Sequence, residues 1–137
     1  MEFLDYPDTD MLMLSLAQTL SRDLRAALAR RERGVFAVPG GTTPGPVFDL
    51  LSAIDLDWSR ITVLPGDERC VPADHPRSNA GQIRARLLRG PAAAATFLPL
   101  WPANSAAVEA LLPLDVALVG MGVDLHTASL FPGAAAL

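Results

Sequence analysis

Cysteine, histidine and basic charge are scarce in this sequence, and each shortage excludes a class of chemistry. The 137 residues include one cysteine and two histidines. The single thiol, Cys70, excludes an internal disulfide, and two histidines provide no recognisable ligand set for a metal such as zinc. The 11 basic residues stand against 15 acidic ones, which leaves a net charge of −4. Because the basic residues also form no block, we expect no nucleic-acid partner. The scarcity of cysteine and histidine leads us to expect no metal, and we expect no cofactor.

Long apolar runs and an export signal are also missing. No run approaches the roughly 20 apolar residues that a membrane helix requires. The first residues, MEFLDYPDTD, are acidic and have neither the basic stretch nor the cleavage site of a secretory signal. We therefore expect no membrane association and a cytoplasmic location. With 50% hydrophobic and 19% charged residues the chain should fold, and its length predicts a single domain over residues 1–137.

Apolar periodicity predicts helices that alternate with strands. After the capping residues at 8–10, apolar residues recur every three or four positions up to Leu28, which indicates a long helix that Gly34 would end. Short apolar runs before turn-rich stretches indicate strands. The predicted order after this helix is a strand at Val35–Val38, a helix from near Pro44 to Ile54, a strand at Ile61–Leu64, a helix at Asn79–Leu88, a short edge strand within residues 97–101, a helix at Asn104–Leu112 and a strand at Val116–Val119.

Strands that alternate with helices predict a parallel sheet with helices on its faces, because parallel strands need crossover connections. In such a sheet the loops after the strands gather at the carboxyl ends and form the ligand crevice. Polar, glycine-bearing loops follow the strands at residues 39–44, 66–79 and 119–133. We expect these loops to meet in one site.

The first loop, residues 39–44, reads PGGTTP. Glycines let backbone N–H groups approach an anion, threonines add hydroxyl donors, and the following helix points its positive end at the same place. These features favour a phosphate ligand. The loop has neither GxGxxG spacing nor a following lysine, so it matches no dinucleotide or Walker pattern. A plain strand-to-helix turn stays open as the alternative.

The second loop, residues 66–79, reads GDERCVPADHPRSN. Arg69, together with Arg77 or with Arg84 in the next helix, would provide a planar fork for phosphate or carboxylate oxygens. The charges at residues 67–69 equally fit a solvated turn. His75 precedes a proline, where turn structure accounts for it.

The third loop, residues 119–133, reads VGMGVDLHTASLFPG. An imidazole exchanges protons near neutral pH, which makes His126 the candidate general base. Asp124, two residues earlier, would orient the imidazole or stabilise its protonated form. The Gly-Met-Gly turn and the two facing loops favour a catalytic over a structural histidine here.

Three segments carry a family resemblance: GGTTPGPVFDLL, DERCVPADHPRSN and GMGVDLHTASLFPG. In this order and spacing they closely resemble the 6-phosphogluconolactonases of the pentose phosphate pathway, over nearly the whole chain. That family shares its glycine loop and a GMG-x-DGH turn with the glucosamine-6-phosphate deaminases, but the tail TASLFPG resembles the lactonase branch. The resemblance implies a Rossmann-like, three-layer α/β/α fold with a parallel sheet, of the NagB/RpiA/CoA-transferase-like class.

The resemblance also implies a reaction, which is the metal-independent hydrolysis of 6-phospho-D-glucono-1,5-lactone to 6-phospho-D-gluconate. His126 would take a proton from the attacking water, and Asp124 would hold His126. From the loop geometry we expect backbone N–H groups at Gly120 and Gly122 to receive the developing oxyanion. The implied phosphate-binding residues are Gly40, Gly41, Thr42, Thr43, Arg69 and Arg84.

The sequence departs from the family pattern in three ways. Leu125 stands where the family has glycine, so a positive φ there would cost about 1–2 kcal/mol and the side chain would reach toward the site. Gly66 and Cys70 replace a larger residue and a tryptophan, and Cys70 has no evident base beside it, which argues against a nucleophile. Family chains continue well beyond Gly133. We therefore expect a C-terminally incomplete domain whose apolar edge self-associates or takes up a completing C-terminal segment.

Other functions stay open at this point. Leu125, Cys70 and the early end favour a catalytically weak or inactive sugar-phosphate-binding relative. A glucosamine-6-phosphate deaminase-like enzyme is another alternative, and a structural or interaction module is the last. The leading hypothesis is a lactonase whose partner is a small sugar phosphate lactone.

Overall fold

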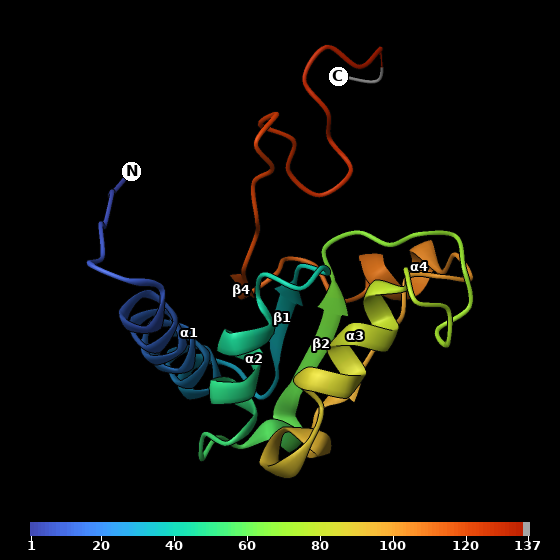
Figure 1. The fold of residues 1–137 in the computed structure, drawn as a ribbon. Helices are drawn as coiled ribbons and strands as arrows, with labels where there is room; N and C mark the ends of the chain where they lie inside the picture. The colour runs from blue at the N-terminus through green and yellow to red at the C-terminus, as the bar shows by residue number, and fades with distance from the viewer. Residues whose placement is uncertain (136–137) are drawn as a thin grey trace.

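Helices and strands alternate along the chain in the computed structural model, which describes residues 1–135 (Figure 1). The last two residues of the expected 1–137 domain lie outside the described residues. The elements are α1 (Thr9–Arg30), β1 (Gly34–Val38), α2 (Gly45–Ser52), η1 (Trp58–Arg60), β2 (Ile61–Pro65), α3 (Asn79–Arg86), η2 (Gly90–Ala94), β3 (Thr96–Phe97), α4 (Ser105–Glu109) and β4 (Val116–Ala117). The expected order of helices and strands is confirmed.

Helix α1 begins and ends through identifiable hydrogen bonds. The Asp8 carboxylate accepts from the Met11 backbone N–H at 2.8 Å, which satisfies a donor of the first turn. At the other end, Arg60 donates from its guanidinium to the carbonyls of Leu28 and Arg31, both at 2.8 Å. The expectation that Gly34 ends this helix is wrong, because the chain is already extended at Arg31 and Gly34 opens β1.

The sheet has four parallel strands in the order β3-β2-β1-β4. All five residues of β1 and of β2 are buried, which is typical of central strands covered on both faces. The expected strand at Val116–Val119 is shorter, because Leu118 makes the last hydrogen bond to β1, at Ala37. Beyond that point β1 ends and the chain turns away at Pro39, which has no N–H for a ladder.

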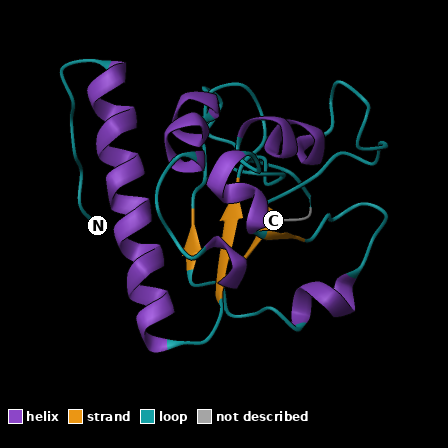
Figure 2. Ribbon diagram, turned by 90° about the horizontal axis from the view of Figure 1, so that it is seen from below, coloured by secondary structure: helices purple, strands orange, loops and turns teal. Residues whose placement is uncertain are grey.

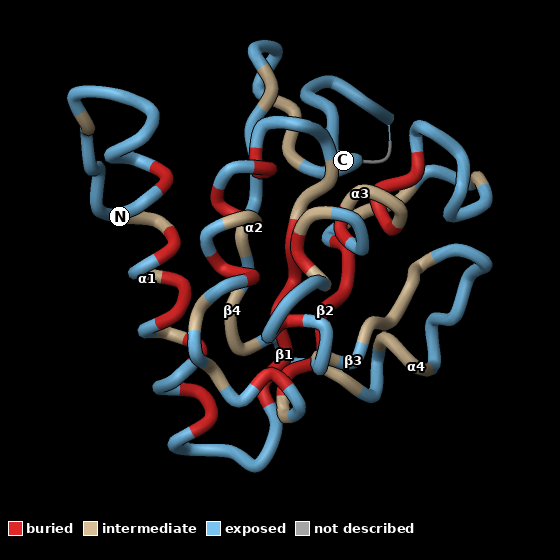
Figure 3. Tube along the Cα trace, turned by 60° about the horizontal axis from the view of Figure 1, so that its bottom comes forward, coloured by how far each residue is buried: buried red, intermediate tan, exposed pale blue. Residues whose placement is uncertain are grey.

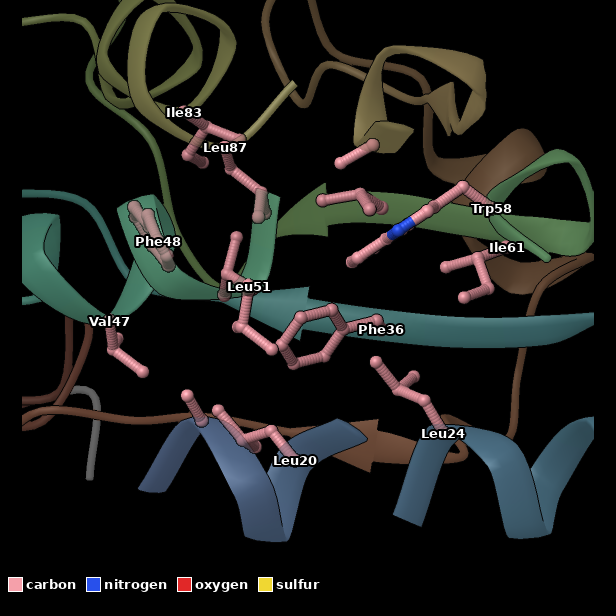
Figure 4. Packing of buried hydrophobic residues seen from close by; sticks show 14 of the residues in the cluster. Leu20, Leu24, Phe36, Val47, Phe48, Leu51, Trp58, Ile61, Ile83 and Leu87 are labelled. Carbon is pink, nitrogen blue, oxygen red and sulfur yellow. The ribbon is translucent and has the colours of Figure 1, made fainter. Parts of the chain in front are cut away.

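Helices cover the sheet on both faces, so the expected three-layer α/β/α arrangement is confirmed. On the first face Leu20 and Leu24 of α1 point toward Phe36 of β1, and Leu51, Ile83 and other side chains from α2 and α3 complete this core (Figure 4). The second face has a smaller core. It joins Val35, Ala37 and Leu64 to Leu98, Leu100, Val108 and Leu111. Burial is therefore concentrated along β1, β2 and one side of α1 (Figure 3).

The arrangement brings the loops after β1, β2 and β4 to the same end of the sheet (Figure 1). Residues 118–135 extend from that end away from the sheet (Figure 1). Helix α1 runs as one long helix along the side of the strands (Figure 2). None of the helices in residues 1–135 combines the length and apolar character needed to cross a bilayer.

Candidate active site

An open cavity of about 430 Å³ lies at the carboxyl ends of the strands and is bordered by all three expected loops and by α1. Its lining consists of Leu12, Met13, Leu16, Pro39, Gly40, Gly41, Thr43, Pro44, Val47, Asp67, Arg69, Leu118, Val119, Gly120, Met121, Gly122, His126 and Ala128. The cavity is large enough for a small metabolite. The loops at 39–44, 66–79 and 119–133 therefore meet as expected.

The glycine loop requires its glycines for different reasons. At Gly41 φ is +83°, in the left-handed region where a side chain would be strained. Gly40 has no room for a side chain, because a Cβ there would overlap the amide of Asn79. Thr43 lines the cavity, whereas Thr42 does not, and the Thr42 carbonyl accepts from the Gly45 N–H at 3.1 Å.

Donors for an anion at this loop come mainly from the loop itself. Pro44 and Pro46 flank the start of α2 and have no N–H groups. The Gly45 N–H is already used by the Thr42 carbonyl. An anion would therefore depend on the N–H groups of residues 40–43 and on Arg69.

The two arginines of the predicted phosphate set lie in different places. Arg69 lines the cavity, and one of its guanidinium nitrogens donates to the Arg77 carbonyl at 2.7 Å. Arg84 is not brought to the cavity. Its position on α3 turns it toward β3, where its guanidinium lies 4.9 Å from the centre of the Phe97 ring. A stacked guanidinium in that place serves packing.

Asp67 and Glu68 make specific hydrogen bonds. The interpretation of residues 67–69 as a solvated turn did not predict these bonds. The Glu68 carboxylate accepts from the backbone N–H groups of Asn79 and Ala80, both at 2.8 Å, and so caps α3. The Asp67 carboxylate accepts from the Ser129 hydroxyl at 2.7 Å and from the Asn79 amide at 3.3 Å. The sequence feature that could have revealed these roles is the position of two acidic residues just after a buried parallel strand, at the edge of the sheet where ligands bind.

His126 and Asp124 form a hydrogen-bonded pair on the third loop. The His126 Nδ1 lies 2.5 Å from the Asp124 carboxylate, and the His126 backbone N–H donates to the same oxygen at 3.3 Å. These two bonds, the side-chain bond first, hold the pKa of the Asp124 carboxyl below its ordinary value of 3.8. Because an ionised Asp124 accepts from Nδ1–H, the Nε2 lone pair is left to accept a proton. His126 lines the cavity, whereas Asp124 does not.

Gly122 and Phe131 both lie against the His126 ring. The Gly122 N–H donates to the His126 carbonyl at 2.9 Å, and a Cβ on Gly122 would overlap the imidazole. Phe131 stacks on His126, with ring centroids 4.7 Å apart and planes at 18°. Gly120 and Gly122 both line the cavity beside this ring.

Leu125 adopts the positive φ expected of the glycine that it replaces, with φ at 68°. Its side chain is 66% exposed and does not line the cavity. The substitution therefore strains the backbone without filling the space beside His126.

The remaining reactive side chains lie outside the cavity lining. Cys70 is exposed. The His75 Nδ1 accepts from the Arg77 backbone N–H at 3.0 Å, which is the turn role expected from the sequence.

Comparison with known proteins gives a consistent result. Residues 7–137 match the family model described as glucosamine-6-phosphate isomerases/6-phosphogluconolactonase. A 6-phosphogluconolactonase of Mesorhizobium japonicum is 44% identical over 140 residues, which cover 94% of this chain and 59% of that protein. A 6-phosphogluconolactonase of Pseudomonas aeruginosa is 44% identical over 133 residues, which cover 89% of this chain and 56% of the relative.

The fold comparison agrees with the sequence comparison. The crystal structure of a 6-phosphogluconolactonase from Shewanella baltica superposes with a TM-score of 0.83 at 36% sequence identity, covering 94% of this chain and 59% of that structure. The chain thus spans somewhat more than half the length of the relatives that it matches.

Proposed function

Because the chain belongs to the glucosamine-6-phosphate isomerase/6-phosphogluconolactonase family, we propose that it hydrolyses 6-phospho-D-glucono-1,5-lactone to 6-phospho-D-gluconate, a step of the oxidative pentose phosphate pathway. One observation carries this proposal. His126, paired with Asp124, lines the same cavity as the glycine loop and Arg69. A base and a set of anion donors facing one cavity are what a phosphorylated lactone requires.

In the proposed reaction His126 acts as the general base. Its Nε2 takes a proton from water as the water oxygen bonds to the lactone carbonyl carbon, and the carbonyl becomes an oxyanion. In this proposal the backbone N–H of Gly120 stabilises that charge. The N–H of Gly122, which the sequence analysis also assigned to the oxyanion, is already used by the His126 carbonyl. The bond from this carbon to the ring oxygen then breaks, and the ring oxygen takes the proton from the imidazolium. Asp124 stabilises the imidazolium between the two transfers.

The glycine loop and Arg69 bind the phosphate in this proposal. Gly40, Gly41, Thr42 and Thr43 supply backbone N–H groups, Thr43 adds its hydroxyl, and Arg69 supplies charge. Thr42 does not line the cavity, so its hydroxyl is left out of the proposed set. Arg84 has no part in it in this structure, because it stacks on Phe97. The chemistry needs no metal or cofactor, since an imidazole is basic enough to activate water.

The proposal is tested with the two histidines of the chain. Lactone hydrolysis above the spontaneous rate is measured for the unmodified chain, His126→Ala and His75→Ala. We expect His126→Ala to lower kcat by about 10²- to 10⁴-fold, which is what a positioned base contributes. His75→Ala is the matched control and retains the activity, because within residues 1–135 the hydrogen bonds of His75 all lie in its own turn.

Other outcomes would favour the alternatives. Binding of 6-phosphogluconate without turnover would identify an inactive relative, and release of ammonia from glucosamine 6-phosphate would identify the deaminase activity.

A phosphorylated substrate does not cross membranes unaided, so we place this activity in the cytoplasm with the enzymes that make the lactone.

A further inference from the structure

Residues 119–135 carry His126 but are attached to the rest of the molecule by few polar contacts. The segment is largely exposed, and Figure 1 shows it rising away from the sheet. Within residues 1–135, a single hydrogen bond joins this segment to the remainder of the chain, from the Ser129 hydroxyl to the Asp67 carboxylate at 2.7 Å. The position of the segment over the cavity therefore depends strongly on that bond.

Ser129 is coupled to His126 through a short closed hairpin. Thr127 and Leu130 exchange backbone hydrogen bonds at 3.1 and 2.9 Å, with Ser129 in the turn between them. His126 directly precedes this hairpin, and Phe131, which stacks on its ring, directly follows. A restraint on Ser129 is consequently a restraint on the imidazole.

Asp67 is itself held from the opposite side. The Asn79 amide donates to the Asp67 carbonyl at 3.0 Å and to its carboxylate at 3.3 Å. Asn79 is only 2% exposed, and its amide fills the space against Gly40 of the glycine loop. The contacts thus run from Gly40 through Asn79 and Asp67 to Ser129, and they join all three loops of the cavity.

We propose that Ser129 and Asp67, held by Asn79, are positioning residues that set His126 against the glycine loop. The inference rests on the proposed function for its effect on catalysis. Ser129 acts on the base and leaves the phosphate donors of residues 40–43 in place. Its loss should therefore affect kcat far more than KM.

The test compares Ser129→Ala, Ser129→Thr and Ser59→Ala. Ser59 is the matched control, because its exposed hydroxyl donates to the Asp57 carboxylate at 2.6 Å, on η1, outside the cavity lining. The first readout is independent of activity. One spin label is attached to the exposed thiol of Cys70, on the loop of Asp67, and another to Ala135→Cys, and the distance distribution between them is recorded. We expect Ser129→Ala to broaden it, Ser129→Thr to restore it, and Ser59→Ala to leave it unchanged.

The second readout is lactone hydrolysis. We expect Ser129→Ala to lower kcat by about 10- to 100-fold with KM within about twofold, and Ser129→Thr to recover most of kcat. An unchanged distance distribution in Ser129→Ala overturns the inference whether or not the chain is active. A broadened distribution with unchanged kcat in an active chain overturns the positioning role. If the unmodified chain does not hydrolyse the lactone, the proposed function fails and the label distances alone decide whether the contact exists.

Discussion

Leu125 shows how one side chain can conflict with the turn that contains it. Its φ of 68° places the Cβ close to the following carbonyl, at a cost of about 1–2 kcal/mol for a residue other than glycine. The turn retains this conformation because the Leu125 N–H donates to the Gly122 carbonyl and the Gly122 N–H to the His126 carbonyl, both at 2.9 Å. Leu125 is two-thirds exposed, so burial of its side chain offsets little of that strain energy.

Leu125→Gly should therefore stabilise the turn. Glycine removes the strain and adds backbone entropy to the unfolded chain, so the net gain is about 0.5–1 kcal/mol. The measurement is the free energy of unfolding in urea. Leu130→Gly is the matched control, because Leu130 is 60% exposed and does not have a positive φ. We expect the control to be destabilised, and equal effects of both substitutions would argue against strain at Leu125.

Three charged side chains join α2, the helix that follows the glycine loop, to α3 and the residues after it. The Asp49 carboxylate of α2 accepts from two guanidinium nitrogens of Arg86 on α3 and from one of Arg89, the last at 2.7 Å. The bond from Arg86 is the main reason that the pKa of the Asp49 carboxyl is lowered from 3.8. The guanidinium of Arg86 also packs against Gly45, the first residue of α2.

This contact predicts a pH dependence of stability. Since the pKa of Asp49 is lower in the folded than in the unfolded chain, the folded state binds fewer protons near pH 4 and its stability rises with pH. The contribution of Asp49 is present above its ordinary pKa and is lost as the pH falls through the lowered one. We expect the free energy of unfolding to fall less between pH 6 and pH 3 in Asp49→Asn than in the unmodified chain.

Asp23→Asn is the control for this measurement. Asp23 pairs with its exposed neighbour Arg22 on the same helix at 3.2 Å, so it connects no second element. Its substitution should leave the pH difference as it is in the unmodified chain. A loss of pH dependence in Asp23→Asn as large as that in Asp49→Asn would contradict the assignment to the α2–α3 contact.

The molecule as a whole leaves apolar surface uncovered. Among the described residues, β4 pairs with β1 and with no second strand. Large apolar side chains are exposed along the segment that follows it, among them Val119, Met121, Val123 and Leu130. Open strand edges and contiguous apolar surface favour association with further polypeptide. We propose that this edge takes up a second copy of the chain or a completing segment.

Self-association through β4 is tested by a charge on the edge strand. Light scattering over a range of concentrations should show a mass above that of the monomer for the unmodified chain, and a lower mass for Ala117→Lys. Ala94→Lys, at an exposed position of η2, is the control and should associate like the unmodified chain. Circular dichroism checks that each variant is folded. A monomeric mass at every concentration would refute self-association.

The order of the elements could be predicted because it follows from neighbouring residues. The cap at Asp8, the apolar spacing through Leu28 and the short apolar runs are local patterns, and local hydrogen bonding responds to them. The edge elements were predicted too long. The expected helix at Asn104–Leu112 is formed only at Ser105–Glu109, and the edge strand only at Thr96–Phe97. Their extent depends on the strands or helices that they contact. In the described part of the chain, β3 pairs with β2 through Thr62 and Val63 alone.

Residue type and spacing were enough to identify the parallel α/β fold, the three loops at one end of its sheet, and His126 as the candidate general base with Asp124 as its carboxylate partner. They could not show that Arg84 turns to Phe97, that Leu125 lies outside the cavity lining, or that Asp67 joins Asn79 to Ser129. Asp67 and Ser129 are 62 positions apart. Such contacts depend on where the packed helices and strands direct each loop, because the side chains of different loops meet only after the chain has folded.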